Sequence, residues 1–563
     1  MIAAAPSRAN VRMSDEMIAI IGRASTAIDA RMDFTRDYRL RFFGYQTIAR
    51  SYLLRPSTRS NLSPILDDQL MERPQHLYMR VALGIFVCLP NKQGHLGASE
   101  EFNARLQDAF TFYDTISMQH ISNASPTMLN AGTVVPQLSS CFQLSTGDDL
   151  ASLFDTVKSA GLISKWSGGI SLWLHNIRAD GAPIRSTGGR SSGIKRYVKI
   201  LNEVQMYVNQ GGNRPGAFAI YLGVDHADIF DFLKLARLKG PDTLGPISSP
   251  DLKYALWVSD MFMEALTNQI QNPNDPTAGD WYLFCPDSAP GLHTAYGDEY
   301  RALYNKYVSE GNYVKCVKAG DIIAEAFKTW AQVGIPYVLF KDAINNKSNM
   351  KNVAPICSSN LCCEITIPSW SEFDAPDFAK YHPDNGAGGE FGVCNLAAVC
   401  LENFVTYSPD GDPWIDYRGI IDAAATEARA LNKLIDLNHY PSEECRRSNQ
   451  RHRPIGVGIM GLADVLAIMK VVYGSAEAAG IARAISASVY HGALSESCRI
   501  AAIDAPYATF SGSPISKGKL QPDLWVDAGN LQIGWESDIA DTTGGIIKSS
   551  DWSALRSSAM CGV

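Results

Sequence analysis

The sequence predicts an α/β protein that begins with a helical domain, and two patterns carry this prediction. As far as about residue 119, apolar and charged residues recur at helical spacing, for example in residues 77–86. Beyond this point, short apolar runs bounded by Gly, Pro and Asn alternate with longer amphipathic stretches, as in residues 216–222 followed by 226–238. This alternation is typical of strands joined by crossover helices.

We therefore divide the chain at about residue 120. Residues 1–120 form the expected helical domain, and residues 121–563 form the expected α/β domain. Residues 55–64 are expected to be a loop, and residues 374–392, rich in Gly, Asp and Pro, a surface insertion between two strands. We expect no chemistry in this insertion, because its composition favours solvent-exposed turns.

The composition indicates a globular protein of the cytoplasm. The chain has 563 residues, of which 46% are hydrophobic, enough to bury a large core. With 58 acidic against 50 basic residues, the net charge of -8 argues against a nucleic-acid-binding surface. No apolar stretch reaches the roughly 20 residues that span a bilayer, so no membrane association is expected.

The twelve cysteines are expected to be reduced, and they are candidates for redox chemistry or for core packing. They are too sparse for a secreted disulfide scaffold, and no paired Cys-x-x-Cys motifs indicate zinc. The sequence also contains no Walker motif and no internal repeat. We therefore expect no metal site in this chain.

The most informative segment is residues 357–364, Cys-Ser-Ser-Asn-Leu-Cys-Cys-Glu. Asn360, Cys362 and Glu364 alternate by two, and in an extended chain such residues point to the same side. One surface would then present an amide, a thiol and a general base together. A strand edge with cysteine as a small apolar residue is the alternative at this point. Cys363 would face the opposite side, where packing is its expected role.

Two further cysteines, Cys141 and Cys394, lie in short segments that help to interpret the segment 357–364. Cys141 lies in Pro-Gln-Leu-Ser-Ser-Cys-Phe, residues 136–142, and Cys394 lies in Gly-Val-Cys-Asn-Leu-Ala, residues 392–397. Together with residues 357–364, these segments resemble the three cysteine motifs of the class I ribonucleotide reductase large subunit. The similarity extends through residues 124–127, 210–216, 341–342, 347–349, 451–456 and 512–518.

The resemblance implies reduction of ribonucleoside diphosphates to deoxyribonucleoside diphosphates by thiyl-radical chemistry. A radical on Cys362 would abstract the ribose 3' hydrogen, and the 2' hydroxyl would leave as water. Glu364 would act as general base at the 3' hydroxyl, while Asn360 orients the sugar. Cys141 and Cys394 would supply two electrons and close a disulfide, which an external dithiol such as thioredoxin or glutaredoxin reopens.

The same resemblance implies the fold and the nucleotide sites. The expected α/β domain is a barrel of two half-barrels, with a central finger loop near residues 357–364 and the C-terminal strands missing. The implied substrate-binding residues are Ser125, Ser140, Gly169, Asn360 and Leu361. The implied binding residues for a dNTP or ATP effector, at an interface between two large subunits, are Asp149, Leu150, Ala151, Lys165, Arg178, Arg185 and Ser186. The basic side chains suit phosphates, and Asp149 suits a ribose hydroxyl or base.

Cofactors and partners are implied in the same way. No cofactor is expected in this chain, because the radical comes from a metal-containing small subunit. A homodimer of large subunits is implied, with a loop between effector and substrate at residues 210–217 that is one residue shorter than in eukaryotic-type sequences. Relative to the family, we expect no ATP cone before the helical domain. We also expect a second chain to supply the C-terminal part of a split enzyme, with a Pro-Thr-Ala-Ser loop, a tyrosine pair and a cysteine pair.

A split enzyme leads to a testable expectation. The chain with a small subunit, a dithiol and an effector should form no deoxynucleotide until a C-terminal fragment is added. The reason is that the substrate diphosphate would lack its binding loop and Cys362 would lack the tyrosines that pass on the radical. The complemented assay is the assay that contains the chain, the small subunit, the dithiol, the effector and this C-terminal fragment. Robust turnover without the fragment would contradict the expectation.

Two other functions compete with this one. A glycyl-radical-type relative would carry a glycyl loop near its C-terminus, and no such motif is visible. A catalytically inactive nucleotide-binding or regulatory homologue is the second alternative, and effector binding without turnover would favour it. The retention of all five reactive positions weighs against it, namely Asn360, Cys362, Glu364, Cys141 and Cys394.

Overall fold

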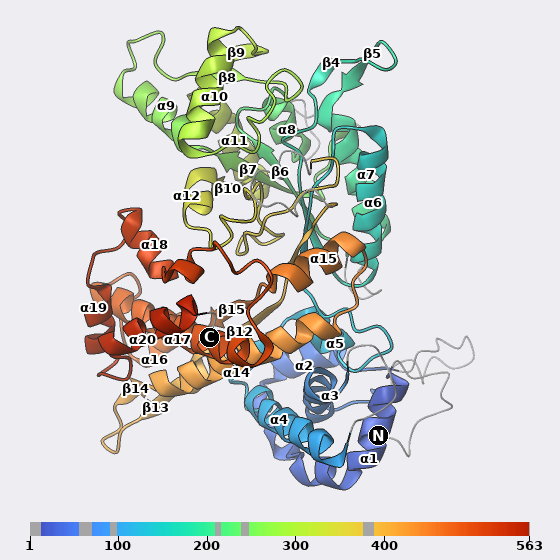
Figure 1. Ribbon diagram of the computed structural model, residues 1–563, viewed down its shortest axis with the longest axis vertical. Helices are drawn as coiled ribbons and strands as arrows, with labels where there is room; N and C mark the ends of the chain where they lie inside the picture. The colour runs from blue at the N-terminus through green and yellow to red at the C-terminus, as the bar shows by residue number, and fades with distance from the viewer. Residues whose placement is uncertain are drawn as a thin grey trace.

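The computed structural model describes residues 13–55, 70–89, 98–208, 215–237, 247–374 and 388–561. In Figure 1 the N-terminal helices lie at one end of the molecule, an α/β region lies at the other, and the C-terminal helices lie beside the middle. The predicted α/β class with a helical beginning is confirmed. The expected loop at 55–64, insertion at 374–392 and coupling loop at 210–217 lie largely outside the described residues.

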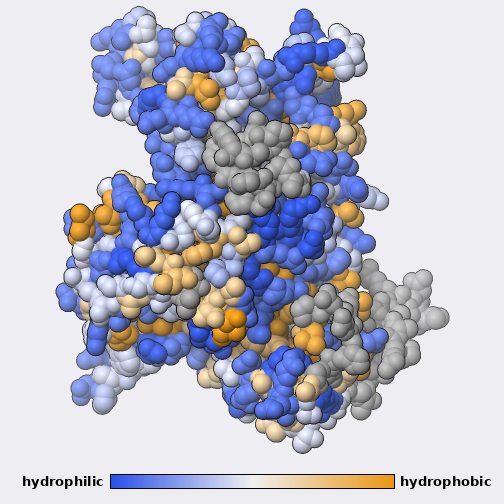
Figure 2. Space-filling model, in the orientation of Figure 1, coloured by the Kyte–Doolittle hydropathy of each residue, from blue (hydrophilic) through white to orange (hydrophobic). Residues whose placement is uncertain are grey.

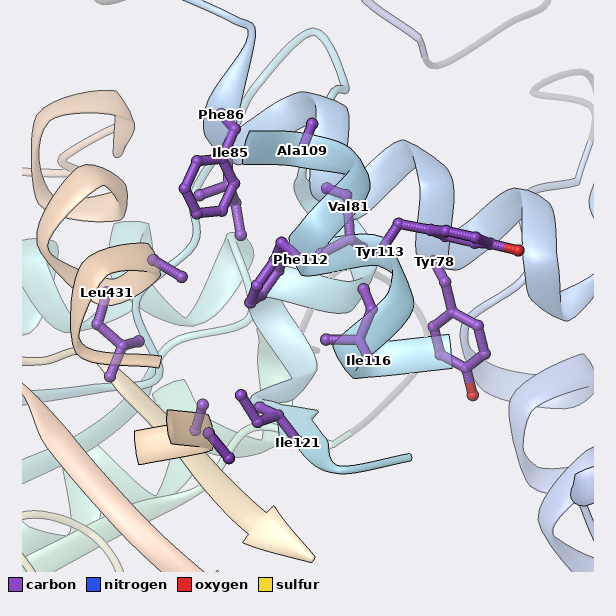
Figure 3. Close-up of a cluster of buried hydrophobic side chains, with 14 of the residues drawn as sticks. Tyr78, Val81, Ile85, Phe86, Ala109, Phe112, Tyr113, Ile116, Ile121 and Leu431 are labelled. Atoms are coloured by element: carbon purple, nitrogen blue, oxygen red, sulfur yellow. The ribbon is translucent and has the colours of Figure 1, made fainter. Parts of the chain in front are cut away.

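The helical domain comprises α1 (Asp15–Arg31), η3 (Phe34–Arg39), α2 (Phe42–Ser51), α3 (Pro74–Phe86) and α4 (Ser99–Ser117). Helix α3 is its centre, because all of its residues except His76 are buried. Figure 3 shows Val81 of α3 and Phe112 of α4 in one cluster of buried side chains. Leu431, which comes from α14 (Tyr417–Leu437), joins the same cluster, so the helical domain shares its core with the rest of the chain.

The main sheet has the strand order β10-β7-β6-β3-β2-β11. Neighbouring strands are parallel except for β11, which is antiparallel to β2. Every residue of β2, β3, β6 and β11 is buried, as is typical of strands covered on both faces. The bounds are β2 (Cys141–Leu144), β3 (Gly169–Trp173), β6 (Phe218–Gly223), β7 (Lys253–Val258), β10 (Tyr337–Phe340) and β11 (Gly392–Cys394).

Helices join the parallel strands, as the alternating sequence pattern predicts. In Figure 1, α6 and α7 lie side by side along one flank of the sheet. Each successive pair of parallel strands is separated by one or more of the following helices: α6 (Leu150–Lys165), α7 (Gly193–Tyr207), α8 (Ile229–Leu235), α9 (Asp260–Gln271), α10 (Gly297–Ser309) and α11 (Ala319–Val333).

A second sheet contains β1 (Ile121–Asn123), β12 (Leu396–Cys400) and β15 (Gly456–Met460), in the order β1-β12-β15. Only Asn395 separates β11 from β12, so the chain passes from the main sheet to the second sheet within one residue. Helix α14 packs on the second sheet and against α17 (Ala476–Asp504) (Figure 1). The two sheets therefore meet directly beside Cys394.

The remaining elements are short hairpins and peripheral helices. The hairpins are β4 (Asp180–Ile184) with β5 (Gly189–Ser192) and β13 (Val405–Tyr407) with β14 (Pro413–Ile415). A further two-stranded sheet pairs β8 (Asp280–Leu283) with β9 (Lys315–Lys318), which are separated in the chain by α10. The helices are α5 (Ser125–Asn130), α12 (Lys341–Asn346), η6 (Leu401–Phe404), α15 (Glu443–His452), α16 (Leu462–Ile468), η7 (Ile515–Lys517), α18 (Gln521–Asp527), α19 (Trp535–Thr542) and α20 (Ser549–Met560). Within the described ranges, no helix is long and apolar enough to cross a membrane.

Glu427 is a buried carboxyl group that the sequence pattern did not reveal. It lies among the buried residues of α14, and its side chain is fully shielded from solvent. Neither carboxyl oxygen has a hydrogen-bond partner among the described residues. Burial therefore raises the pKa of Glu427 well above its usual 4.5.

We expect Glu427→Gln to stabilise the protein at neutral pH. The folded state keeps a proton that the unfolded chain releases above about pH 4.5, so stability falls as the pH rises toward the raised pKa. The slope from this one group is up to about 1.4 kcal/mol per pH unit. Urea unfolding near pH 5 and near pH 7 should show a smaller fall in the variant.

Glu496 of α17 provides the matched control. Burial acts to raise its pKa, but hydrogen bonds from Arg499 and Arg429 outweigh burial and lower the pKa. Its charged form therefore stabilises the fold above the unfolded pKa, and Glu496→Gln should lose stability near pH 7. If Glu427→Gln keeps the wild-type dependence on pH, the assignment of Glu427 as a protonated buried group is wrong.

Candidate functional site

Cys141 and Cys394 face each other across two strands of the main sheet. Cys141 begins β2, Cys394 ends β11, and the two residues are paired in the antiparallel register. Residues paired in this way have Cα atoms about 4.5–5.5 Å apart, within the range that a disulfide bridges. Both side chains are buried and both thiols are free. The structure thus brings together the two cysteines expected to form the redox pair.

Both thiols of this pair are held in the protonated form. Burial raises the pKa of Cys141 to about 12, although the neighbouring Asn360 side chain acts to lower it. Burial, together with the adjacent Cys141, raises the pKa of Cys394 well above its usual 9.0. A nucleophilic cysteine requires the thiolate, whereas these two remain thiols near neutral pH. The pair is therefore suited to donate hydrogen and electrons to a group placed against it.

Hydrogen bonds hold the backbone at the start of the segment 357–364 in place. The side-chain amide of Asn345 in α12 donates to the Ile356 carbonyl at 3.0 Å, and its oxygen accepts from the Ile356 backbone amide at 2.8 Å. His175, which follows β3, bonds the carbonyl oxygen of Cys357 through Nε2 at 2.7 Å. Helix α12 and the main sheet together fix the point from which the segment extends.

The expected extended strand through residues 360–364 is wrong. Residues 361–363 form a turn, and Cys363 adopts the left-handed conformation with a φ of 71°. The backbone N–H of Asn360 donates to the Ile365 carbonyl at 3.0 Å, and the backbone N–H of Cys363 donates to the backbone carbonyl of Asn360 at 3.3 Å. These backbone bonds close the segment on itself. A period-two pattern of side chains could not reveal them.

The turn nevertheless gathers the reactive side chains near the thiol pair. Cys362 and Glu364 are exposed at its tip, and Asn360 is wholly buried. All three lie close enough to Cys141 to influence its pKa. Burial and then the Glu364 carboxyl group raise the pKa of Cys362 itself. The five residues expected to be reactive therefore surround one centre.

Asn360 and Ser140 each place a buried polar atom at this centre that has no hydrogen-bond partner among the described residues. Asn360 Oδ1 accepts from the Ile365 amide at 3.0 Å, but the buried Nδ2 of the same side chain makes no hydrogen bond there. Ser140 Oγ, one residue before Cys141, is also shielded and unpartnered. A buried polar atom without a partner costs free energy, so both atoms are candidates to hydrogen-bond a polar ligand.

Gly169, the first residue of β3, lies against the turn. A Cβ atom at this position would stand 2.8 Å from Leu361 Cδ2 and 3.5 Å from Cys141 Sγ. Only a residue without a side chain allows Leu361 to pack this closely on the strand. The structure therefore places Gly169 and Leu361 at the centre. Ser125, at the start of α5, forms a hydrogen bond of 2.8 Å with the Tyr52 hydroxyl.

Asn395 joins the two sheets at this centre, and the sequence did not suggest a role for it. Its Oδ1 accepts from Ser139 Oγ, and its Nδ2 donates to Asn449 Oδ1 and to the Pro454 carbonyl, each at 2.8 Å. This buried network ties the strand junction to α15 and to the segment before β2. The signal for it was the place of Asn395 directly after Cys394 in the motif at 392–397.

Two family descriptions match the chain in sequence. The all-alpha domain of ribonucleotide reductase matches residues 38–136, and the barrel domain of ribonucleotide reductase matches residues 139–561. The chain belongs to the ribonucleotide reductase large-subunit family. This confirms the resemblance inferred from the cysteine motifs and the order of a helical domain followed by a barrel-type domain.

Curated relatives carry the name ribonucleoside-diphosphate reductase large subunit. The African swine fever virus protein (strain Badajoz 1971 Vero-adapted) is 44% identical over 562 residues, covering 98% of this chain and 67% of the viral protein. The Caenorhabditis elegans protein is 38% identical over 525 residues, covering 93% of this chain and 59% of that protein. The Arabidopsis thaliana protein is 38% identical over 530 residues, covering 91% and 58%. The expected class of oxidoreductase is therefore confirmed.

In this ribonucleotide reductase chain, part of the expected effector site lies at the N-terminal end of α6. Asp149 caps the helix, because its Oδ1 accepts from the Ser152 amide at 3.1 Å. Its Oδ2 is buried and has no hydrogen-bond partner in the described part of the chain. Leu150 and Ala151 follow in the first turn of the helix and are both exposed. This end of α6 therefore combines a buried, unpaired carboxylate oxygen with an exposed apolar surface.

The two expected arginines lie beside this helix end. Arg178 pairs with Asp148 at 2.6 Å and donates to the Pro183 carbonyl at 2.9 Å, which ties the β4–β5 hairpin to the start of α6. Arg185 and Ser186 lie exposed in the connection of that hairpin. The guanidinium of Arg185 pairs with Asp287 at 3.0 Å, and its side chain is 76% exposed.

Lys165 departs from the expected grouping. It is the last residue of α6, so the rise of a helix places it about 22 Å from Leu150. Its ammonium group lies over the Trp166 ring, 5.0 Å from the centroid. Within one chain, Lys165 therefore cannot bind the same phosphate as Arg178. Sequence motifs could not show this, because they carry no information on which helix end each residue occupies.

Proposed function

We propose that this chain is the catalytic core of a large subunit that reduces ribonucleoside diphosphates through a thiyl radical on Cys362. The observation that carries the proposal is the pairing of Cys141 with Cys394 across β2 and β11, beside a turn that exposes Cys362. A reducing pair and a separate exposed thiol at one centre are what this chemistry requires. A packing role would not need Cys362 to be exposed.

The proposed reaction assigns one step to each group. Cys362, as a radical, takes the 3' hydrogen of the ribose, while Glu364 accepts the proton of the 3' hydroxyl. The unpartnered Nδ2 of Asn360 donates a hydrogen bond to the sugar. The 2' hydroxyl leaves as water, taking one proton. As Cys141 and Cys394 form a disulfide, they supply that proton together with a second proton and two electrons, which form the new C–H bond at the 2' carbon, while Glu364 returns its proton to the 3' oxygen. Cys362 then returns hydrogen to the 3' carbon, and thioredoxin or glutaredoxin in the cytoplasm reduces the disulfide.

The radical itself is supplied by the metal centre of a small subunit. Among the described residues, no group of three or more His, Cys, Asp or Glu side chains could hold a metal ion. The role of this chain is to bind the ribose, to exclude competing reactions and to deliver the reducing equivalents. Ser140, Gly169 and Leu361 line the proposed substrate position, and we place Ser125 at its edge.

We further propose that effector binds between two copies of this chain. A second α6, packed antiparallel to the first, would bring its Lys165 to the helix end that carries Asp149 and Arg178. The exposed face of α6 and α7 suits such packing, because it is rich in apolar side chains (Figure 2). The exposed apolar residues of this face are Leu150, Phe154, Leu162, Ile200, Met206 and Tyr207.

Arg178→Ala is expected to weaken the binding of dTTP or ATP by about 10- to 100-fold. A hydrogen bond between a charged donor and a phosphate contributes about 1.5–3 kcal/mol, and each 1.4 kcal/mol corresponds to tenfold. Isothermal titration measures the affinity. The control is Arg301→Ala, which removes a surface arginine paired with Glu264 on another part of the molecule. Unchanged affinity in Arg178→Ala would show that the effector binds elsewhere.

The complemented assay tests the proposal as a whole. We expect deoxynucleotide formation that requires the small subunit, the dithiol and the effector. The inactive homologue would bind effector with wild-type strength and form no product under these conditions. The assembly of all five reactive residues around one centre favours the enzyme over that alternative.

A further inference from the structure

Tyr221 connects the main sheet to the turn that carries Cys362. It lies in β6, near the middle of the sheet, and its side chain is wholly buried. Its hydroxyl donates to the Asn360 carbonyl at 2.7 Å and lies 3.3 Å from Cys363 Sγ. One hydroxyl group therefore contacts the residues on both sides of the 361–362 pair.

The turn has a conformation that needs such support. Cys363 has a φ of 71°, a region that L-residues other than Gly, Asn and Asp rarely adopt. On the opposite side, Gln143 of β2 donates to the Ile365 carbonyl at 3.3 Å and accepts from the Ile367 amide at 3.4 Å. The segment is thus hydrogen-bonded both to Tyr221 in β6 and to Gln143 in β2.

We propose that Tyr221 is a positioning residue that fixes Cys362 over the thiol pair by clamping Asn360 and Cys363. This inference rests on the proposed function of Cys362 and Asn360. Tyr221 contacts neither of the two cysteines in the redox pair through a hydrogen bond among those described, so its effect passes through the turn. The clamp would hold the radical thiol and the sugar-binding amide in one fixed relation.

The hydroxyl of Tyr221, rather than its ring, carries this role. The ring packs edge to face with Trp257 at 6.5 Å, within a cluster that includes Trp173 and Ala219. A phenylalanine would occupy the same space and keep these contacts. Tyr221→Phe therefore removes the hydrogen bonds to the turn and leaves the packing of the sheet intact.

The first experiment is hydrogen exchange on the intact chain. In Tyr221→Phe, we expect the amides of Cys363 and Ile365 to exchange about threefold to tenfold faster, the scale of one lost hydrogen bond. The matched control is Tyr337→Phe in β10. Tyr337 lies near enough to Cys363 and Cys362 for their charges to affect it, but it makes no hydrogen bond to the turn among those described. Equal protection in wild type and Tyr221→Phe would overturn the clamp.

The second experiment measures turnover in the complemented assay. Because Tyr221 contacts the turn and not the ligand, Tyr221→Phe should lower kcat by about tenfold or more and leave KM nearly unchanged. Cys363→Ser places a hydroxyl beside Tyr221 without branching at Cβ and should retain kcat, whereas Cys363→Ala should lower it. A rise in KM with kcat unchanged would contradict a positioning role. If wild type forms no product, the proposed function fails, and hydrogen exchange still decides whether the clamp exists.

Discussion

Cys362→Ser is expected to abolish deoxynucleotide formation in the complemented assay, by more than about a thousandfold. A serine hydroxyl does not form the radical that a thiol forms, so the 3' hydrogen of the ribose stays in place. Cys362 is exposed at the tip of the turn, and the substitution changes one atom. Effector affinity and the melting temperature should therefore match those of the wild type. The measurement is the amount of deoxynucleotide formed per chain.

Cys316→Ser provides the control for this result. Cys316 is also an exposed thiol, but it lies in β9, outside the candidate site. Its replacement should leave turnover unchanged. Turnover by Cys362→Ser at a tenth of the wild-type rate or above would rule out Cys362 as the radical carrier.

Cys141→Ser and Cys394→Ser are each expected to stop repeated turnover, again by more than about a thousandfold. The two thiols act as a unit, because a disulfide needs both sulfur atoms and delivers two electrons together. The double variant should therefore be no worse than either single variant, a non-additive result. Steady-state formation of deoxynucleotide with excess dithiol measures the effect.

Cys400→Ser is the control for loss of a buried thiol. Cys400 ends β12, is buried like Cys394, and has its pKa raised to about 12, chiefly by burial. Its replacement costs a similar change in packing without touching the redox pair. Sustained turnover in either Cys141→Ser or Cys394→Ser would mean that the reducing equivalents come from other groups.

The sequence predicted the chemical composition of the candidate site well. Cys141, Cys394 and the segment 357–364 each lie in a short motif, and the resemblance of these motifs to the ribonucleotide reductase large subunit implies the reaction. The alternation of apolar runs with amphipathic stretches also predicted the strands and helices of the main sheet. The helical beginning was visible in the spacing of residues 77–86, which fall in α3.

The sequence could not predict how the chain bends at the site. The period-two spacing of Asn360, Cys362 and Glu364 fits a strand, but backbone bonds between Asn360 and Ile365 close a turn instead. Such bonds depend on which segments meet, and side-chain order does not record them. The same limit applies to Lys165, whose separation from Arg178 follows from the length of α6.

Polar residues within apolar segments were also hidden. Tyr221 lies in the run Phe-Ala-Ile-Tyr-Leu-Gly of β6, where a tyrosine looks like any other large core residue. Only its distance to the Asn360 carbonyl shows what the hydroxyl does. Glu427 lies on a helix with many charged residues, and its burial depends on how α14 packs against its neighbours.

The most direct test of the central claim is to map the thiols after a reaction without an external dithiol. The complemented assay is run with a C-terminal fragment whose own cysteines are replaced by serine, then quenched in acid, and free thiols are alkylated after unfolding. We predict about one deoxynucleotide per chain, with a disulfide between Cys141 and Cys394 and with Cys362 still free. Product formed while both thiols of the pair remain free, or a disulfide that joins other cysteines, would contradict the account.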